Sequence, residues 1–482
     1  MYFQKSNYFE TGYVRAIIDG VIVKLRRWDM NKYKFFAALI IIVAVFFVPI
    51  NAYAEFSHTI RVGLTRSFGN RDSIQVNNAS IWAGYGVEEG FLPMVELFSE
   101  STFTVRAGGG NVEIVYGGRV LYTFTAGRPA QIMASDSDII LLGGERYRGS
   151  IEFVPSGGRI TAVNVLSLEE YLFGVLPAEM SHSFHLEALK AQAVASRSFS
   201  FHQILQSKHV DQNFDICDTT CCQVYRGAYS EHENTTMAVL QTYGLMLFHD
   251  GEIISANYFS SSGGATENSE DVWWEARAYL RSVNEIVEHN PMVWERTFTW
   301  TQLTNAASNA GARIGAVTGV SISQLGASGR VLELTLHGAN GSWAIPRSVG
   351  VRSFFNAIGG TLPSRNFQIA GAAHSTPQVG VTNGVQNINS PLNSFQALDA
   401  NGAISTVHFG YVYDGQATRH IESTPNIARG GNGITISGRG WGHGVGMSQL
   451  GAEGMARAGF TFDEILHHYY TDVVIFWYSV FH

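Results

Sequence analysis

Apolar residues between Thr59 and Leu166 fall into short segments that are rich in β-branched side chains. Glycine, Asn, Asp and Ser separate these segments, which is the pattern of β-strands joined by turns. The folded part of the chain is therefore expected to begin as β-structure. The predicted strands include Thr59–Leu64, Thr102–Arg106, Val112–Tyr116 and Ile160–Val165.

Helical spacing of apolar residues follows this region. Ser167-Leu-Glu-Glu170 is a capping box, which marks the start of a helix. That helix is predicted to end near Gly174, because Pro177 prevents its continuation. A longer helix is predicted from about His185 to Gln206, where apolar residues recur at the spacing of one helix face.

The last third of the chain mixes both patterns. The predicted elements are a helix at Thr301–Gly311, strands at Gly319–Ser323, Arg330–His337 and from Ile434, a helix around Ser448–Arg457, a capping box at Thr461–Glu464 and a strand near Val473–Trp477. Residues 371–403 lack periodicity and are interpreted as a long surface insertion. The fold class predicted is α+β, with mixed, largely antiparallel sheets, a long motif-bearing helix and a C-terminal unit of strand, glycine loop and helix.

The N-terminal segment has the pattern of an export signal. From Met30 the chain has two lysines, an uncharged apolar run and the small-residue site Ala52-Tyr53-Ala54. We interpret residues 30–54 as a signal peptide, residues 1–29 as an upstream extension and residues 55–482 as the folded region. The alternative is an uncleaved membrane anchor, although Pro49 interrupts the apolar run before the length of a full span. An extracytoplasmic location is expected in either case.

Charge and cysteine content narrow the functional class. Residues 1–54 hold 7 basic and 3 acidic side chains, which leaves 25 basic and 37 acidic ones and a formal net charge of −12. This balance argues against nucleic acid or anionic lipid as the main partner. The 3 cysteines lie together at Cys217, Cys221 and Cys222, so they do not form the disulfide framework of a small exported domain.

Leu176-Pro-Ala-Glu179-Met places a carboxylate between a proline-marked turn and the start of the long helix. Apolar neighbours such as Phe173 and Phe184 can raise the pKa of this carboxyl, as a general acid requires near neutral pH. The alternative is a structural Glu at a helix N-terminus, where the macrodipole would lower its pKa. Spacing alone favours the structural interpretation.

The long helix carries Lys190 and Arg197, which share one face because they stand seven residues apart. After residue 54 the only lysines are Lys190 and Lys208, in a region that otherwise uses Arg, so Lys190 is a candidate for a specific role. The alternative is a solvated charged face on which Glu187 pairs with Lys190.

Glycine alternates with other residues from Gly438 to Gly446. If this segment is extended, Arg439, Trp441 and His443 project from one face, where Trp441 can stack on a sugar ring and His443 can orient hydroxyl groups. The alternative is a structural glycine-rich turn.

Two further clusters are candidates. Tyr258-Phe-Ser260-Ser261-Ser262 is interpreted as a polar turn that lines a substrate, because no nucleophile elbow is present. Cys217 with Cys221 or Cys222, and a histidine such as His209, can hold zinc. A local disulfide or free thiols are equally open alternatives.

The order of these motifs resembles the stage II sporulation protein D family. The motifs are LSLEEYLFGVLPAEM, EALKAQAVASRSFS, YFSSSGG and GRGWGHGVGMSQLGAEGMARAGFTFDEILHHYY. The resemblance extends from about Ile60 to the C-terminus, with insertions near residues 75–130 and 371–431. It implies a peptidoglycan lytic transglycosylase that cuts glycan strands, for some members strands already stripped of stem peptides.

The resemblance also implies roles for single residues. Glu179 matches the catalytic acid/base, and Lys190 and Arg197 match basic residues of the same cleft. It supports a structural zinc held by Cys217, Cys222 and His209, while the chemistry itself requires no cofactor. Many members carry a histidine shortly after the tyrosine of YFSSSGG, and none stands there in this chain. The candidate substrate contacts are Gln192, Tyr258, Ser260, Ser261, Trp441, His443 and Gln449.

Lytic transglycosylation fits a single catalytic carboxylate, whereas ordinary glycosidases use two. The expected partners are peptidoglycan glycan strands and a cell-wall amidase, and membrane contact is expected only if the N-terminal segment is uncleaved. Two other functions stay open. One is a non-catalytic wall-binding protein that stimulates an amidase, and the other is a zinc-dependent wall hydrolase.

Overall fold

A computed structural model describes residues 58–478, apart from residues 79, 88–89, 99–101, 126, 136, 347–349 and most of 371–426. The predicted signal peptide and upstream extension, and most of the predicted insertion at 371–431, therefore lie outside the described residues. Between residues 371 and 426 only three hairpins are described: β22 (Gln378–Thr382) with β23 (Asn387–Pro391), β24 (Gln396–Leu398) with β25 (Ile404–Thr406), and β26 (Tyr411–Tyr413) with β27 (Thr418–His420). None of the helices described has the length and apolar character of a membrane span.

Two sheets form the first part of the described chain. One has seven strands in the order β13-β1-β12-β11-β8-β3-β4, and the other has six in the order β10-β9-β2-β5-β6-β7. Nearly all neighbours are antiparallel. The strands are β1 (Thr59–Gly63), β2 (Ser73–Val76), β3 (Ser80–Val87), β4 (Gly90–Phe98), β5 (Phe103–Gly108), β6 (Asn111–Tyr116), β7 (Arg119–Phe124), β8 (Ala130–Ala134), β9 (Ile139–Leu142), β10 (Glu145–Arg148), β11 (Ser150–Ser156), β12 (Arg159–Ser167) and β13 (Ile216–Cys217).

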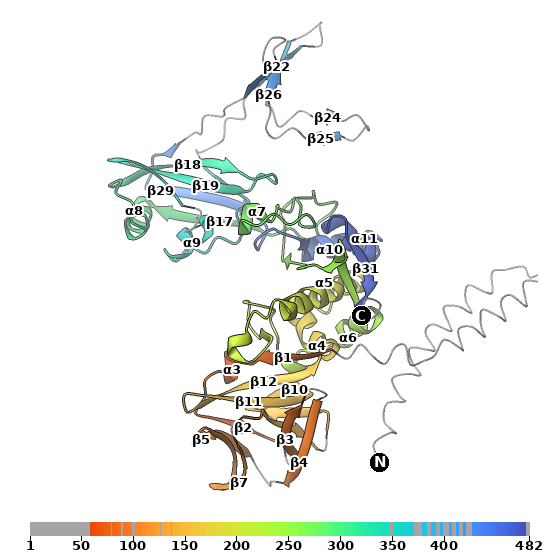
Figure 1. Ribbon diagram of the computed structural model, residues 1–482. Helices are drawn as coiled ribbons and strands as arrows, with labels where there is room; N and C mark the ends of the chain where they lie inside the picture. Colours follow the sequence, from red (N-terminus) through yellow and green to blue (C-terminus); the bar gives the residue numbers. More distant parts are fainter. Residues whose placement is uncertain are drawn as a thin grey trace, which may run out of the picture. The chain divides into compact units, whose positions relative to one another are not determined.

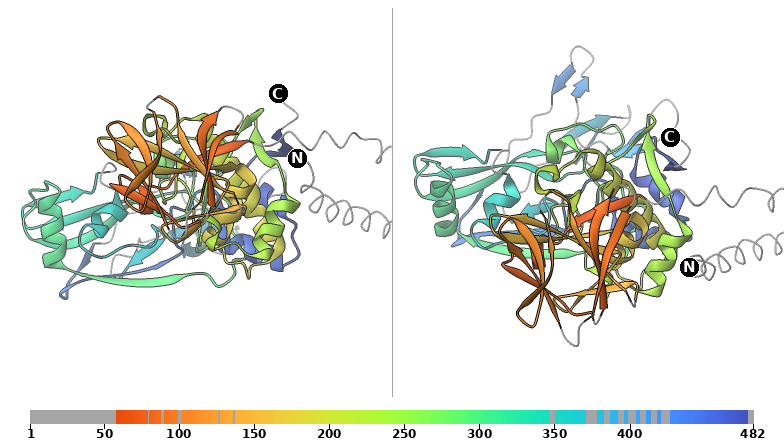
Figure 2. Two further views of the ribbon diagram at one scale, coloured as in Figure 1. Left: turned by 90° about the horizontal axis from the view of Figure 1, so that it is seen from below. Right: turned by 60° about the horizontal axis from the view of Figure 1, so that its bottom comes forward.

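Alternate residues of these strands are buried, which is why the sequence folds here as β-structure. In β2, for example, Ile74 and Val76 are buried while their neighbours are exposed. The two sheets meet through β12, which contacts β2 and β5, and their strands form one body of β-structure in the red-to-orange part of Figure 2. The strands predicted for this region are confirmed.

Five helices follow or pack nearby: α4 (Leu168–Glu179), α5 (Leu186–Leu205), α6 (Glu233–Gln241), α10 (Gln449–Arg457) and α11 (Phe462–Tyr469). The long helix α5 contacts α4 and α6 on one side and α10 and α11 on the other (Figure 1). Both predicted capping boxes are present, at Ser167 and at Thr461. A sheet of β15 (Glu252–Ile253), β14 (Leu245–His249) and β31 (Val474–Trp477) also contacts α5.

The prediction that the first of these helices ends near Gly174 is wrong. Helix α4 continues through Pro177 to Glu179. Proline removes one backbone hydrogen bond and crowds the carbonyl four residues earlier, and here only two residues of the helix follow it. The N–H of Met180 still donates to the carbonyl of Leu176 and closes the helix.

The remaining β-structure encloses a separate apolar core. Buried side chains such as Phe298, Val320, Leu334, Phe355 and Ile436 form this core. Two sheets surround it, with strand orders β17-β29-β21 and β20-β19-β18-β28. The elements are β17 (Val293–Thr299), α8 (Trp300–Asn309), β18 (Val317–Leu325), β19 (Val331–Gly338), β20 (Gly341–Ala344), α9 (Val351–Asn356), β21 (Phe367–Ile369), β28 (Ala428–Arg429) and β29 (Gly433–Arg439).

The glycine-rich motif is not extended, contrary to one sequence interpretation. Gly440, Gly442, Gly444 and Gly446 all have positive φ, between 77° and 112°, so the backbone turns at every second residue. The turns bring β30 (Met447–Ser448) beside β16 (Tyr258–Phe259) as a parallel pair. The motif therefore works as a structural turn that joins two segments distant in sequence.

We predict that Gly446→Ala destabilises the protein strongly, because an added Cβ would lie 2.0 Å from the carbonyl oxygen of Asn257. Gly110→Ala is the matched control, since Gly110 also has positive φ but nothing within 4 Å of an added Cβ. Both substitutions carry the cost of a left-handed residue, about 1 kcal/mol. Guanidinium unfolding should show a further loss of about 1–3 kcal/mol for Gly446→Ala. Equal losses would contradict the close approach.

Candidate active site

Glu179 is the last residue of α4, not the N-terminal residue of a helix as the sequence suggested. Its side chain is half-buried. The C-terminal end of a helix carries the negative end of the macrodipole, so it disfavours a carboxylate. The structural interpretation made from the sequence expected a helix dipole that favours the carboxylate form of Glu179. At this end of α4 the dipole instead disfavours that form.

Burial raises the pKa of Glu179 above its ordinary value. Two weaker effects oppose this shift: the N–H of Val224 donates to Oε1 at 2.9 Å, and the charge of Arg226 lies nearby. The carboxyl group therefore stays protonated to a higher pH than an exposed Glu, as a general acid requires.

A buried polar network supports the residues around Glu179. Gln223 donates from Nε2 to the hydroxyl oxygen of Tyr258 at 2.9 Å, and its Oε1 accepts from the hydroxyl of Ser200 at 2.5 Å. Burial raises the pKa of Tyr258 well above its ordinary value, and the charge of Glu179 adds to this shift. Tyr258 is thus a neutral phenol held close to Glu179.

Gln192 and Gln449 also lie beside Glu179, although both are buried. Gln449 donates from Nε2 to the backbone carbonyl of Glu179 at 3.1 Å and to Oε1 of Gln192 at 3.4 Å. Gln192 donates in turn to Ser196 at 2.9 Å. The structure brings these predicted residues together, and their contacts fix the ends of α4, α5 and α10 at the site.

Arg197 is fully buried and holds helices together. Its Nε and Nη2 donate to the two carboxylate oxygens of Glu169, at 2.8 and 2.7 Å, and two further bonds go to the carbonyls of Leu245 and Val239. Four of its five N–H donors are used inside the core and its side chain is 0% exposed, so this structure does not place Arg197 in an open cleft. The prediction that Arg197 faces the substrate is corrected here, because its charge is compensated inside the core.

Lys190 pairs with Glu187 on its own helix at 2.7 Å, as the structural alternative expected. Its ammonium group also lies 6.0 Å from the ring centroid of Phe462. The second oxygen of Glu187 accepts from the N–H of Phe462 at 2.9 Å. Lys190 therefore stands where α5 meets the start of α11, and no hydrogen bond or ion pair joins it to Glu179 in the described chain.

The serine-glycine turn encloses a carboxylate. Ser261 donates from its hydroxyl to Glu288 at 2.6 Å, and the N–H groups of Ser262 and Gly263 donate to the same carboxylate at 2.8 and 2.9 Å. Ser261 is fully buried, while Ser260 is partly exposed. The prediction that Ser261 lines the substrate is corrected, because its hydroxyl is committed to Glu288.

Of the two predicted ring contacts, Trp441 is exposed and His443 is half-buried. Trp441 is 46% exposed and exchanges backbone hydrogen bonds with Ser261. The ring of His443 lies 4.9 Å from that of Trp273, and its Nδ1 accepts from the N–H of Val445. Burial lowers the pKa of His443 to about 4, so the imidazole is neutral near pH 7.

The structure brings His209 and all three cysteines together. One ligand atom from each of His209, Cys217, Cys221 and Cys222 lies within 4.8 Å of the others. Cys217 is positioned by β13, which pairs with β1, and His209 stands in the loop after α5. Cys221, which the predicted ligand set omitted, belongs to the cluster.

Sequence reasoning missed three groups next to Glu179: the side chain of Gln223, the N–H of Val224 and the charge of Arg226. These residues follow directly after Cys221 and Cys222. A metal ion bound by the cysteines would hold this loop in place, so a predicted metal site also predicts a fixed loop. Nothing in the residue types alone marks a backbone N–H as part of a site.

We predict that Arg197→Met lowers the free energy of unfolding by about 3–5 kcal/mol, because it leaves Glu169 as a buried unpaired charge. Arg106→Met is the control, since Arg106 is 47% exposed in its pair with Glu113. An exposed pair contributes at most about 1 kcal/mol. Guanidinium unfolding of the two variants measures the difference. A loss no greater than that of the control would show that Arg197 does not hold the helices.

Comparison with known proteins agrees with the motifs. Residues 156–249 match the family model described as stage II sporulation protein. An amidase enhancer of Bacillus subtilis is 30% identical over 360 residues, which cover 70% of this chain but only 45% of that protein. Stage II sporulation protein D of the same organism is 28% identical over 322 residues, 64% of this chain and 74% of the relative. An uncharacterised protein of Brachyspira hyodysenteriae is 27% identical over 345 residues, 71% and 76% of the two chains. Glu179 and helix α5 lie inside residues 156–249, so this part of the chain belongs to the stage II sporulation protein D family.

Proposed function

We propose that this protein is an exported cell-wall enzyme that cleaves peptidoglycan glycan strands by lytic transglycosylation. The observation that carries the proposal is Glu179: a half-buried carboxyl with a raised pKa, at a helix C-terminus, beside the neutral phenol of Tyr258. This is the environment of a general acid rather than of a structural Glu. Family membership supports the cell-wall role.

The reaction needs a proton donor that then becomes a proton acceptor. Glu179 donates its proton to the oxygen of the bond between N-acetylmuramic acid and N-acetylglucosamine as that bond breaks. The resulting carboxylate accepts the proton of the muramyl C6 hydroxyl, whose oxygen attacks C1. The products are a 1,6-anhydro sugar and a free N-acetylglucosamine end, and no water is consumed.

One carboxylate is sufficient for this reaction, whereas a hydrolase needs a second one about 5–9.5 Å away. The raised pKa of Glu179 and its place at the end of α4 single it out as the carboxylate for this reaction, which supports transglycosylation.

The four-residue cluster fits a structural zinc ion. Three thiolates and one imidazole are the ligand set of closed tetrahedral sites, and the hydrogen bond with Cys222 lowers the pKa of the Cys217 thiol. His209, Cys217, Cys221 and Cys222 would hold the ion, which would supply no chemistry but would cross-link the loop before Gln223 and Val224. Those two residues support Tyr258 and Glu179.

We predict that the protein releases anhydro-ended fragments from purified glycan strands and that Glu179→Gln abolishes their release. The amide cannot donate or accept the proton, so a loss of at least about 100-fold is expected. Mass spectrometry of the products, from strands with and without stem peptides, measures it. Glu453→Gln is a control that changes a buried carboxyl bound to Arg457 and to the N–H of His185.

Ordinary reducing ends in place of anhydro ends would show a hydrolase with a second carboxylate. No release by well-folded protein would overturn the enzyme and favour an amidase stimulator, the activity that the name of the Bacillus subtilis relative states. Mixing the protein with a wall amidase and measuring the amidase rate separates these outcomes.

We predict that the purified protein contains about one zinc ion and that a chelator lowers its melting temperature and its activity together. Cys221→Ser should weaken metal retention, whereas Ser207→Ala, in the nearby loop, should not. Metal analysis and thermal unfolding measure both effects. Loss of activity with an unchanged melting temperature would indicate a catalytic metal and support a zinc hydrolase.

A further inference from the structure

Two adjacent tryptophans on a short turn face two different cavities. Helix α7 (Glu270–Trp273) ends at Trp274, which has a left-handed φ of 72°. This conformation is rare for a large side chain and is found mostly at functional turns. Trp273 lines one cavity and Trp274 lines the other, and they are 40% and 63% exposed.

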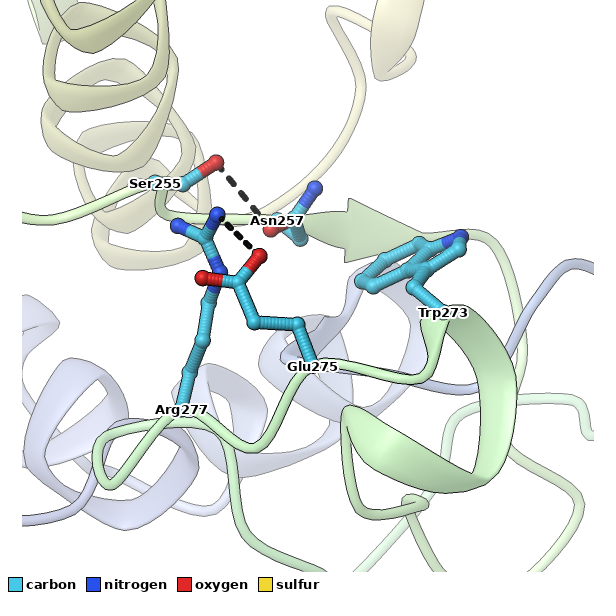
Figure 3. Close-up of a pocket in the computed structure, with 5 residues that line it drawn as sticks. All are labelled: Ser255, Asn257, Trp273, Glu275 and Arg277. Atoms are coloured by element: carbon cyan, nitrogen blue, oxygen red, sulfur yellow. Dashed lines mark hydrogen bonds and ion pairs between the residues drawn. The ribbon is translucent and has the colours of Figure 1, made fainter.

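The first cavity has a volume of about 190 Å³, and Figure 3 shows the five residues that line it. It is lined by Ser255, Asn257, Trp273, Glu275 and Arg277, and Asn257 directly precedes Tyr258. The guanidinium of Arg277 bonds to Glu275 at 2.9 Å, so the lining has no net charge. The amide nitrogen of Asn257 has no protein partner within the described part of the chain, while its oxygen accepts from Ser255. An indole wall with one amide donor suits an uncharged acetamido sugar.

The second cavity, of about 220 Å³, is lined by charged side chains of both signs. Arg352 and Arg365 line it together with Trp274 and His443. Arg352 uses only its Nε, which donates to the carbonyl of Leu362 at 2.9 Å, and no carboxylate among the described residues pairs with it. This leaves its two terminal amino groups available for a carboxylate, which a guanidinium binds in a forked geometry.

The charges around this second cavity leave a positive excess. Two carboxylates, Glu270 and Asp271, also line it. Glu270 is bound by both terminal nitrogens of Arg281, at 2.7 and 2.6 Å. Asp271 is then the one lining carboxylate that remains against the two lining arginines. Behind the wall, buried Glu267 faces buried Arg330. After burial, the charges that lower the pKa of His443 are those of Arg330, Arg352 and Arg365. The neutral imidazole therefore sits in a positive potential.

We propose that the two cavities are neighbouring sugar subsites, the first for an uncharged N-acetylhexosamine and the second for a sugar that carries a carboxylate. The rings of Trp273 and His443, 4.9 Å apart, join them. This inference rests on the proposed function, because the peptidoglycan strand alternates an uncharged sugar with one that bears a lactyl group. Its carboxylate is free only after the stem peptide is removed. Arg352 is thus a specificity residue for stripped strands.

The test measures binding without turnover. Protein that carries Glu179→Gln is titrated calorimetrically with two tetrasaccharides: the stripped peptidoglycan fragment, with free lactyl carboxylates, and the chitin fragment, which has none. We expect the acidic fragment to bind about tenfold more tightly, as a charge-assisted hydrogen bond predicts. Adding Arg352→Gln should remove this advantage and leave the affinity for the chitin fragment unchanged. Trp273→Ala should weaken both ligands.

Two controls separate a local contact from general electrostatics and from misfolding. Arg313→Gln removes the same charge at an exposed position and should leave the advantage intact. Arg352→Lys keeps the charge and should restore part of it. Two outcomes would overturn this inference and leave the proposed function intact. One is equal affinity of the Glu179→Gln protein for both fragments, and the other is an equal loss of affinity for both fragments with Arg352→Gln. Failure of that protein to bind either fragment would overturn the proposed function as well.

Discussion

The hydrogen bond from the N–H of Val224 to Glu179 is the contact on which the rest of the site depends. It joins the end of α4 to the loop that follows the cysteine cluster, and the preceding residue, Gln223, holds Tyr258 from the same loop. This backbone donor holds the carboxyl in place and lowers its pKa, but the effect of burial, which raises the pKa, is larger. The loop thus sets both the position of the carboxyl and its acidity, and anything that fixes the loop acts on Glu179.

The core around α5 explains why basic residues of the motif do not surround the carboxyl. Arg197 neutralises Glu169 inside the protein, and Lys190 neutralises Glu187 at the start of α11. A free cation beside Glu179 would lower its pKa, which would weaken a general acid. Only Arg226 has this effect in the described chain, and burial outweighs it. Cationic groups for a substrate are found instead at the Trp274 cavity.

Local patterns predicted the elements well, because capping boxes and alternating burial act within a few residues. Both boxes and the strands of the first sheets are where the sequence indicated. The sequence failed where a feature depends on distant partners. It ended α4 at Gly174, although the helix continues through Pro177 to Glu179. It expected Ser261 to face a substrate, although Glu288 occupies its hydroxyl. No local signal reports that Arg197 pairs with Glu169 across 28 positions of the chain.

The bond between Gln449 and the carbonyl of Glu179 spans 270 positions of the chain. Contacts of such long range form late, since every intervening residue must be available before the loop can close. During synthesis the N-terminal sheets and α5 can fold while the C-terminal helices are still missing. The Glu179 carboxyl then lacks one side of its surroundings until α10 and α11 have been synthesised. The order of the chain itself thereby delays assembly of the complete site.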